Sequence, residues 1–145
     1  MMALGPKGEA LIKGFEKLEL TAYLDGGGVP TIGWGHTRGV ALGDTCTEAQ
    51  AEEYFQSDVA PVVAALNRCL TAFVTQNQFD AMCSLAFNIG VGAFEGSTLL
   101  RYVNAHKPAA VVGGEFLRWN KDNGKIVLGL VRRRKAESDL YQSGA

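Results

Sequence analysis

The stretch that decides the fold spans residues 14–37 and reads GFEKLELTAYLDGGGVPTIGWGHT. It begins with an alternating run of strand-forming residues, continues through three consecutive glycines at 26–28, and ends in a second strand-like run. Alternation on both sides of a glycine-rich turn is typical of a β-hairpin. The sequence therefore predicts a hairpin over about residues 21–35.

Three polar residues occupy distinct places around this hairpin. The segment from Pro6 to about Glu16 has apolar residues nearer to helical spacing, and proline is tolerated in the first turn of a helix. Glu16 is therefore expected where a helix gives way to the hairpin, Asp25 at the turn and Thr31 on the returning strand. Side chains from three different elements are thus expected to converge on one cleft.

Two carboxyl groups that face one cleft are the minimum set of catalytic groups for hydrolysing a glycosidic bond. One carboxyl group donates a proton to the leaving oxygen, and the other stays ionised to hold a water or to stabilise the transition state. Glu16 and Asp25 are the candidates for these two roles. Composition alone equally allows a surface glutamate and an unrelated turn aspartate.

The spacing of these residues resembles a known active-site segment. Glu16 is followed after eight residues by Asp25, and Asp25 after five by Thr31, which runs directly into Ile-Gly-Trp-Gly-His. This pattern is similar to that of the T-even type phage lysozymes, or endolysins, a glycoside hydrolase family. The chain looks close to lambdoid-type members without a signal-arrest-release segment, and the likeness extends over roughly residues 9–142.

The resemblance implies roles for the three residues and marks one departure. It implies that Glu16 is the general acid, and that Asp25 and Thr31 position the attacking water and stabilise the transition state. The family usually has Gly after the catalytic Glu, whereas this chain has Lys17. Glycine adopts a positive φ at a helix end at little cost. Lys17 must either bear some backbone strain or end the helix differently.

The resemblance implies further site residues outside the hairpin. His36 is expected to pair with Asp58 in a structural role, with a catalytic base as the alternative for His36. Phe87 and Asn88 are expected to line the substrate cleft, although a core aromatic and a helix-terminal Asn explain them equally well. In the family an arginine near the end of the chain pairs with the catalytic Glu. Arg132, the first of four consecutive cations, is the candidate.

The expected fold is α+β and mostly helical, with a lysozyme-like arrangement of a small hairpin lobe and a helical lobe joined by a long helix. The single domain 1–145 would comprise an N-terminal lobe at about 1–46, a connecting helix at about 47–70 and a C-terminal lobe at about 71–145. Further helices are predicted over about 75–90, 97–104, 109–119 and from 129, and a short third strand at 40–42.

Composition narrows the possible classes of protein. The 47% hydrophobic and 20% charged residues are usual for a globular domain. Three cysteines without a Cys-x-x-Cys motif, and only two histidines, predict neither a disulfide framework nor a metal site, and no cofactor is expected. Residues 1–60 carry about −5 and residues 61–145 about +4. Because no aromatic stacking platform is interleaved with the basic residues, nucleic acid is not an expected partner.

The resemblance implies a lysozyme that cleaves the β-1,4 bond between N-acetylmuramic acid and N-acetylglucosamine in peptidoglycan, for host cell lysis. Two alternatives remain: a lytic transglycosylase, and a non-catalytic peptidoglycan-binding virion module. The start of the sequence has no signal-peptide pattern. We therefore expect a protein that stays in the host cytoplasm until lysis, with a monomer as the default. The resemblance implies that a holin lets it cross the membrane, after which it acts in the periplasm on the cell wall.

Overall fold

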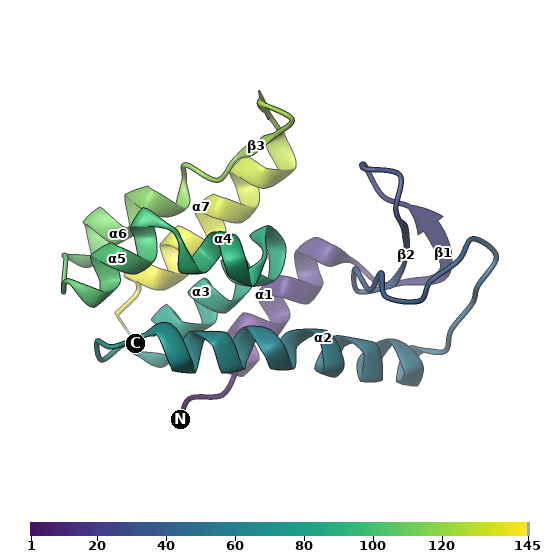
Figure 1. Ribbon diagram of the computed structural model, residues 1–145, viewed down its shortest axis with the longest axis horizontal. Helices are drawn as coiled ribbons and strands as arrows, with labels where there is room; N and C mark the ends of the chain where they lie inside the picture. The colour runs from purple at the N-terminus through teal and green to yellow at the C-terminus, as the bar shows by residue number, and fades with distance from the viewer. Residues whose placement is uncertain (145) are drawn as a thin grey trace. The chain divides into compact units, whose positions relative to one another are not determined.

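The computed structural model describes residues 1–144 and is α+β and mostly helical (Figure 1). Its elements, in chain order, are α1 (Pro6–Glu16), β1 (Glu19–Leu24), β2 (Pro30–Gly33), α2 (Glu48–Cys69), α3 (Gln76–Ile89), α4 (Val91–Glu95), α5 (Thr98–Asn104), α6 (Ala109–Phe116), β3 (Lys121–Asp122), β4 (Lys125–Ile126) and α7 (Leu128–Gln142). The predicted hairpin and helices are present. The short α4 and the β3–β4 hairpin were not predicted, and α6 ends three residues earlier than expected.

The chain divides into two compact units. One contains residues Met1–Ile12 together with Val62–Ala145, and the other contains Lys13–Pro61. The helices α1 and α2 each continue from one unit into the other. The smaller unit is therefore inserted, in sequence, between two parts of the larger one.

The smaller unit is built on the hairpin of β1 and β2. The strands are antiparallel, with Tyr23 opposite Thr31 and Leu24 opposite Pro30. A small apolar cluster of Ile32, Cys46 and Ala51 lies beneath it. Half-buried residues packed against this cluster are Leu18, Ala22, Trp34, Val40 and Tyr54.

The third strand predicted at 40–42 is wrong. The chain turns there instead, because Asp44 accepts a hydrogen bond from the backbone N–H of Ala41 through Oδ2 at 2.9 Å and donates its own N–H to the Ala41 carbonyl. A short polar side chain that bonds the nearby backbone favours a turn over a strand. The pairing with β1 occurs just beyond this turn, as an isolated bridge between Thr21 and Thr45.

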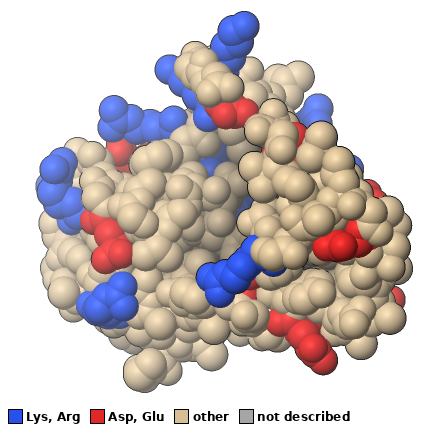
Figure 2. Space-filling model, turned by 45° about the vertical axis from the view of Figure 1, so that its right-hand side comes forward, with Lys and Arg blue, Asp and Glu red and all other residues tan. Residues whose placement is uncertain are grey.

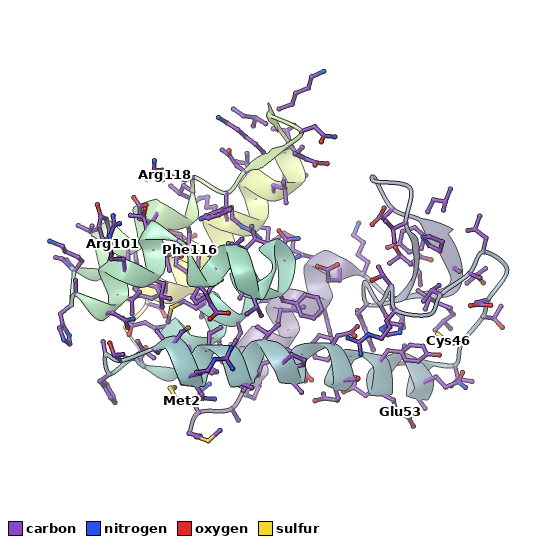
Figure 3. The ribbon with its side chains drawn as sticks, in the orientation of Figure 1. Met2, Cys46, Glu53, Arg101, Phe116 and Arg118 are labelled. Atoms are coloured by element: carbon purple, nitrogen blue, oxygen red, sulfur yellow. The ribbon has the colours of Figure 1, made fainter. Side chains whose placement is uncertain are left out.

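The larger unit is organised around α3, which is buried along nearly its whole length. Figure 1 shows α7 beside α3, and α6 packs against α7. Phe116 of α6 is fully buried among these helices (Figure 3). The predicted helix starts are confirmed: Thr75 and Gln78 form a capping box, and the Ser97 side chain accepts from the N–H of Leu100.

Asp80 of α3 caps the start of α1. Its carboxylate accepts the backbone N–H of Gly5 at 2.9 Å and of Gly8 at 3.1 Å, and Asp80 is 1% exposed. The first N–H groups of a helix have no partner within the helix, and a negative charge near them is favourable. A side chain 72 residues away thus supplies the cap that the local sequence lacks.

A buried ionic cluster joins α7 to α3. Glu137 is fully buried and lies between Arg133 and Arg134, with Arg134 Nε 2.8 Å from its Oε1. Ser84 of α3 donates its hydroxyl to the same carboxylate. Burial raises the pKa of Glu137, while Arg134, Ser84 and Arg133 oppose that rise. These buried polar side chains thus gather around one carboxylate, and opposite charges lie next to each other where water is excluded.

The remaining features concern thiols, charge and membrane insertion. The three cysteines are free thiols, and burial raises the pKa of Cys83 far above its usual range. On the face drawn in Figure 2, basic and acidic side chains are interspersed. Within residues 1–144, no helix has both the length and the apolar character needed to cross a bilayer.

Candidate functional site

Glu16 is the last residue of α1 and is half-buried. The next residue, Lys17, has a φ of 58° and closes the helix by donating its N–H to the carbonyl of Lys13. Of the two possibilities for Lys17, the structure contains the strained one, because a left-handed backbone is unfavourable for a residue with a side chain. The strain ends the helix directly behind Glu16 and leads the chain into β1.

Replacing Lys17 by Gly should therefore stabilise the fold. We expect the free energy of unfolding to rise by about 1 kcal/mol, the approximate cost of a left-handed residue with a Cβ. Denaturant unfolding measures the change. Lys7→Gly is the matched control, because Lys7 lies in the first turn of α1 and glycine there should destabilise. A loss of stability in both variants would contradict the prediction.

Gly35 forms a close backbone surface against Glu16. Gly35 has a φ of +79°, and a Cβ added there would lie 2.5 Å from Glu16 Oε1 and 3.2 Å from its carboxyl carbon. The Glu16 carboxyl group thus rests against the chain just after β2. Only glycine fits both the conformation and the space.

We expect Gly35→Ala to lower activity about 10²-fold, because the new methyl group pushes the Glu16 carboxyl out of place and small misplacements cost that much. Gly39→Ala is the control. Gly39 also has a positive φ of +71°, but nothing lies within 4 Å of its added Cβ. Turnover and unfolding are measured for both variants. We expect both variants to lose similar amounts of stability and only Gly35→Ala to lose activity. If both variants lost equal activity, the effect would be due to backbone strain.

Asp25 is fixed by the hairpin turn. Its Oδ1 accepts the backbone N–H groups of Gly27 at 2.9 Å and Val29 at 2.8 Å, while its own N–H donates to the Val29 carbonyl. The side chain is exposed. Since the hydrogen bonds described for this carboxylate fall on Oδ1, the orientation of Oδ2 is set while that oxygen stays accessible to water.

Thr31 lies in β2 and is 3% exposed. Its hydroxyl donates to the carbonyl of Val29 at 2.8 Å. A hydroxyl has one proton and two acceptor lone pairs. Because the proton is directed at Val29, Thr31 Oγ1 presents lone pairs to any further partner. The three residues of the predicted motif therefore all lie in the smaller unit, on the hairpin and at the end of the helix that leads into it.

His36 pairs with Asp58, as the resemblance implied. His36 Nδ1 lies 2.8 Å from Asp58 Oδ2, and the imidazole stacks on the ring of Tyr54 with a 4.3 Å centroid separation. His36 is buried, and its N–H and carbonyl exchange hydrogen bonds with Ile32. These contacts tie the end of the hairpin to α2, which favours the structural role over that of a base.

One contact near Glu16 was not predicted. Lys13, one turn earlier on α1, reaches Glu52 of α2 and places its ammonium 4.2 Å from the Trp34 ring centroid and 4.9 Å from that of Phe55. The hydrogen bond from Lys13 lowers the pKa of Glu52. Aromatic faces attract cations. Nothing in the local sequence around Lys13 indicates this contact, because its partners come from distant elements.

The other predicted site residues belong to the larger unit. Phe87 is half-buried and packs against the core, while exposed Asn88 lines a cavity of about 510 Å³ with Trp119 and Lys121. Arg132 is exposed, unlike its buried neighbours in the ionic cluster. Roles in substrate binding for Phe87 and Asn88, and a supporting role for Arg132, remain predictions.

The described residues offer no metal centre. Among residues 1–144, no three His, Cys, Asp or Glu side chains are grouped so that they could hold a metal ion. What the smaller unit does contain is the Glu16 carboxyl group at the end of α1, the Asp25 carboxyl group held in the hairpin turn, and the Thr31 hydroxyl, whose proton is directed at Val29. This set is suited to acid-assisted hydrolysis.

Comparison with known proteins shows to which family the chain belongs. Residues 13–137 match the family model described as Phage lysozyme. The chain belongs to the phage lysozyme family. The endolysin of Acyrthosiphon pisum secondary endosymbiont phage 1 is 44% identical, over 98% of this chain and 99% of that protein. The endolysin of Salmonella phage P22 is 40% identical, over 99% of this chain and 100% of that protein. The endolysin of Bacillus phage PZA is longer, and the chain spans 56% of its length.

Solved structures of similar proteins have the same fold as this chain. The muramidase domain of SpmX from Asticaccaulis excentricus superposes with a TM-score of 0.90 at 34% identity, covering 99% of both chains. The endolysin from Escherichia coli O157:H7 phage FAHEc1 superposes with a TM-score of 0.89 at 39% identity, covering 99% of this chain and 96% of that one. The predicted lysozyme-like fold is confirmed. The protein is a lysozyme, a glycoside hydrolase that degrades peptidoglycan, and these relatives do not favour the two alternatives.

Proposed function

We propose that this phage lysozyme is an endolysin that hydrolyses the β-1,4 bond between N-acetylmuramic acid and N-acetylglucosamine in bacterial peptidoglycan. Glu16 is the general acid that protonates the leaving glycosidic oxygen. Asp25 and Thr31 hold the water that attacks the anomeric carbon from the opposite face of the sugar. The family membership and the hydrogen bonds that fix Asp25 and Thr31 support the proposal.

The observation that carries the proposal is the pair of acceptors on the hairpin. Thr31 gives its only proton to Val29, and Asp25 has Oδ1 occupied by two backbone N–H groups. Thr31 Oγ1 and Asp25 Oδ2 are therefore both suited to accept a hydrogen bond from one water. Such a water has both hydrogens held, so that its lone pair is free to attack carbon.

Two acceptors holding one water favour a single displacement with inversion over a covalent intermediate. In an inverting enzyme, the water stands between the carboxylate and the sugar. Asp25 then withdraws a proton from the water while Glu16 gives one to the leaving oxygen, so the two carboxyl groups exchange protonation states. A proton transfer through solvent restores them for the next turnover.

The reaction is tested by identifying its products. Purified Gram-negative sacculi are digested, and the soluble fragments are analysed by mass spectrometry. Fragments with reducing-end N-acetylmuramic acid are expected. Fragments with 1,6-anhydro ends would instead identify a transglycosylase. Proton NMR at early times, before mutarotation, then reads the anomer: the α anomer is expected for inversion, and the β anomer would contradict it.

We also propose that the protein acts as a monomer and reaches the wall from the host cytoplasm through a membrane lesion made by a holin. Support for the route comes from the family resemblance, which implies a holin. Light scattering on the purified chain tests the monomer. Expression in a Gram-negative host with and without a holin tests the route: lysis only with the holin is expected, and prompt lysis without it would contradict the proposal.

A further inference from the structure

Tyr23 shares a face of the hairpin with the proposed water-holding residues. It lies directly opposite Thr31 in the β1–β2 pairing. Directly opposed residues of an antiparallel pair point to the same face, as do residues two apart along a strand. The ladder continues past β1, because the Asp25 N–H donates to Val29. Tyr23, Asp25 and Thr31 are therefore neighbours on one face.

The phenol of Tyr23 also lies within the electrostatic reach of the proposed general acid. Burial and then the carboxylates of Glu16, Glu19 and Asp25 raise the pKa of Tyr23. Negative charges around a phenol disfavour its ionised form, so the hydroxyl keeps its proton at neutral pH. The side chain is 37% exposed, which leaves part of the ring and its polar end open to a ligand.

The three proposed catalytic residues leave no hydrogen-bond donor for the rest of the sugar. The ionised Asp25 carboxylate can only accept hydrogen bonds, and the Thr31 hydroxyl already donates its proton to the Val29 carbonyl. The proton of Glu16 is committed to the leaving oxygen. A glycan, in contrast, presents hydroxyl and amide oxygens that accept, together with an apolar C–H face. An aromatic ring with a protonated hydroxyl matches both properties.

We infer that Tyr23 is a substrate-binding residue of the active site, whose hydroxyl donates a hydrogen bond to an oxygen of the sugar held over Asp25 and Thr31. The inference rests on the proposed function, because that function brings the sugar to this face. The ring forms an apolar wall beside the sugar, and its hydroxyl supplies the donor that the carboxylates and Thr31 do not.

The test is Tyr23→Phe, which keeps the ring and removes the hydroxyl. Loss of one neutral hydrogen bond should lower kcat/KM on soluble peptidoglycan fragments about 3- to 10-fold. The same factor should appear in the Kd for a muropeptide tetrasaccharide, measured in the Glu16→Gln background to prevent turnover. Tyr102→Phe is the matched control, since Tyr102 is a half-buried tyrosine of α5 that packs against the core. It should change neither quantity.

Three outcomes overturn the inference. The first is a Tyr23→Phe variant that binds and turns over substrate like the parent protein, and the second is a loss of activity that tracks a fall in melting temperature, which indicates packing alone. A shift of the pH–rate limbs without a change in Kd would instead place Tyr23 in the control of the carboxyl groups. Failure of the proposed function is seen separately, as Glu16→Gln that remains active; Tyr23 is then tested by the comparison of kcat/KM with that of the parent protein, which needs no inactive background.

Discussion

Glu16→Gln should lower turnover of peptidoglycan by about 10²–10⁴-fold while leaving the fold and substrate binding intact. General acid catalysis contributes about this much to rate. The amide has the shape of the carboxyl group but has no proton to give to the leaving oxygen. Its fit against Gly35 should be kept, because that contact depends on size. Release of soluble fragments from sacculi measures the rate.

Glu19→Gln is the control for this prediction. Glu19 begins β1 only three residues after Glu16, is exposed, and loses the same charge when replaced. It should retain activity close to that of the parent protein, whereas Glu16→Gln should not. If Glu16→Gln stayed within tenfold of the parent rate, another group would have to be the acid, and the roles proposed for the hairpin would need to be reassigned.

Glu137→Gln should destabilise the larger unit by about 3–5 kcal/mol. The carboxylate is fully buried between two guanidinium groups, and removing one partner of such a set leaves an uncompensated charge in the core. Urea unfolding, followed by circular dichroism, reports the change as a lower midpoint. The variant still folds at low temperature if the total stability exceeds this cost, and its residual activity should then be near normal.

Asp139→Asn is the matched control on the same helix. Asp139 pairs with Lys135, and both side chains are more than half exposed. Exposed pairs contribute about 0–1 kcal/mol, so this neutralisation should hardly move the midpoint. A similar small effect from Glu137→Gln would show that the buried cluster is not held together by its charges.

The features that were predicted from sequence depend on short stretches of chain. Alternation and a glycine run lie within residues 14–37, so the hairpin and the placement of Glu16, Asp25 and Thr31 follow from local rules. The strand predicted at 40–42 is wrong because Asp44 bonds the backbone of Ala41 and makes a turn. A three-residue apolar run carries too little information to outweigh such turn chemistry.

The features that were missed depend on distant partners. Lys13 meets Glu52 across 39 residues, and Ser84 meets Glu137 across 53. A run of four cations in a helix points in all directions, and sequence alone does not say which of them are buried. The structure buries Arg133 and Arg134 and exposes Arg132. Such contacts emerge only once the elements are packed.

The cap that Asp80 provides for α1 has a consequence for how the chain is made. Gly5 and Gly8 are synthesised before their partner Asp80, which follows more than seventy residues later. The start of α1 therefore stays uncapped while the hairpin segment is synthesised and its two strands pair through contacts close in sequence. Closing the larger unit needs a long loop to be drawn together, which is slow in comparison with local pairing. Translation order thus favours a nascent chain in which the β1–β2 hairpin forms before the helical unit is complete.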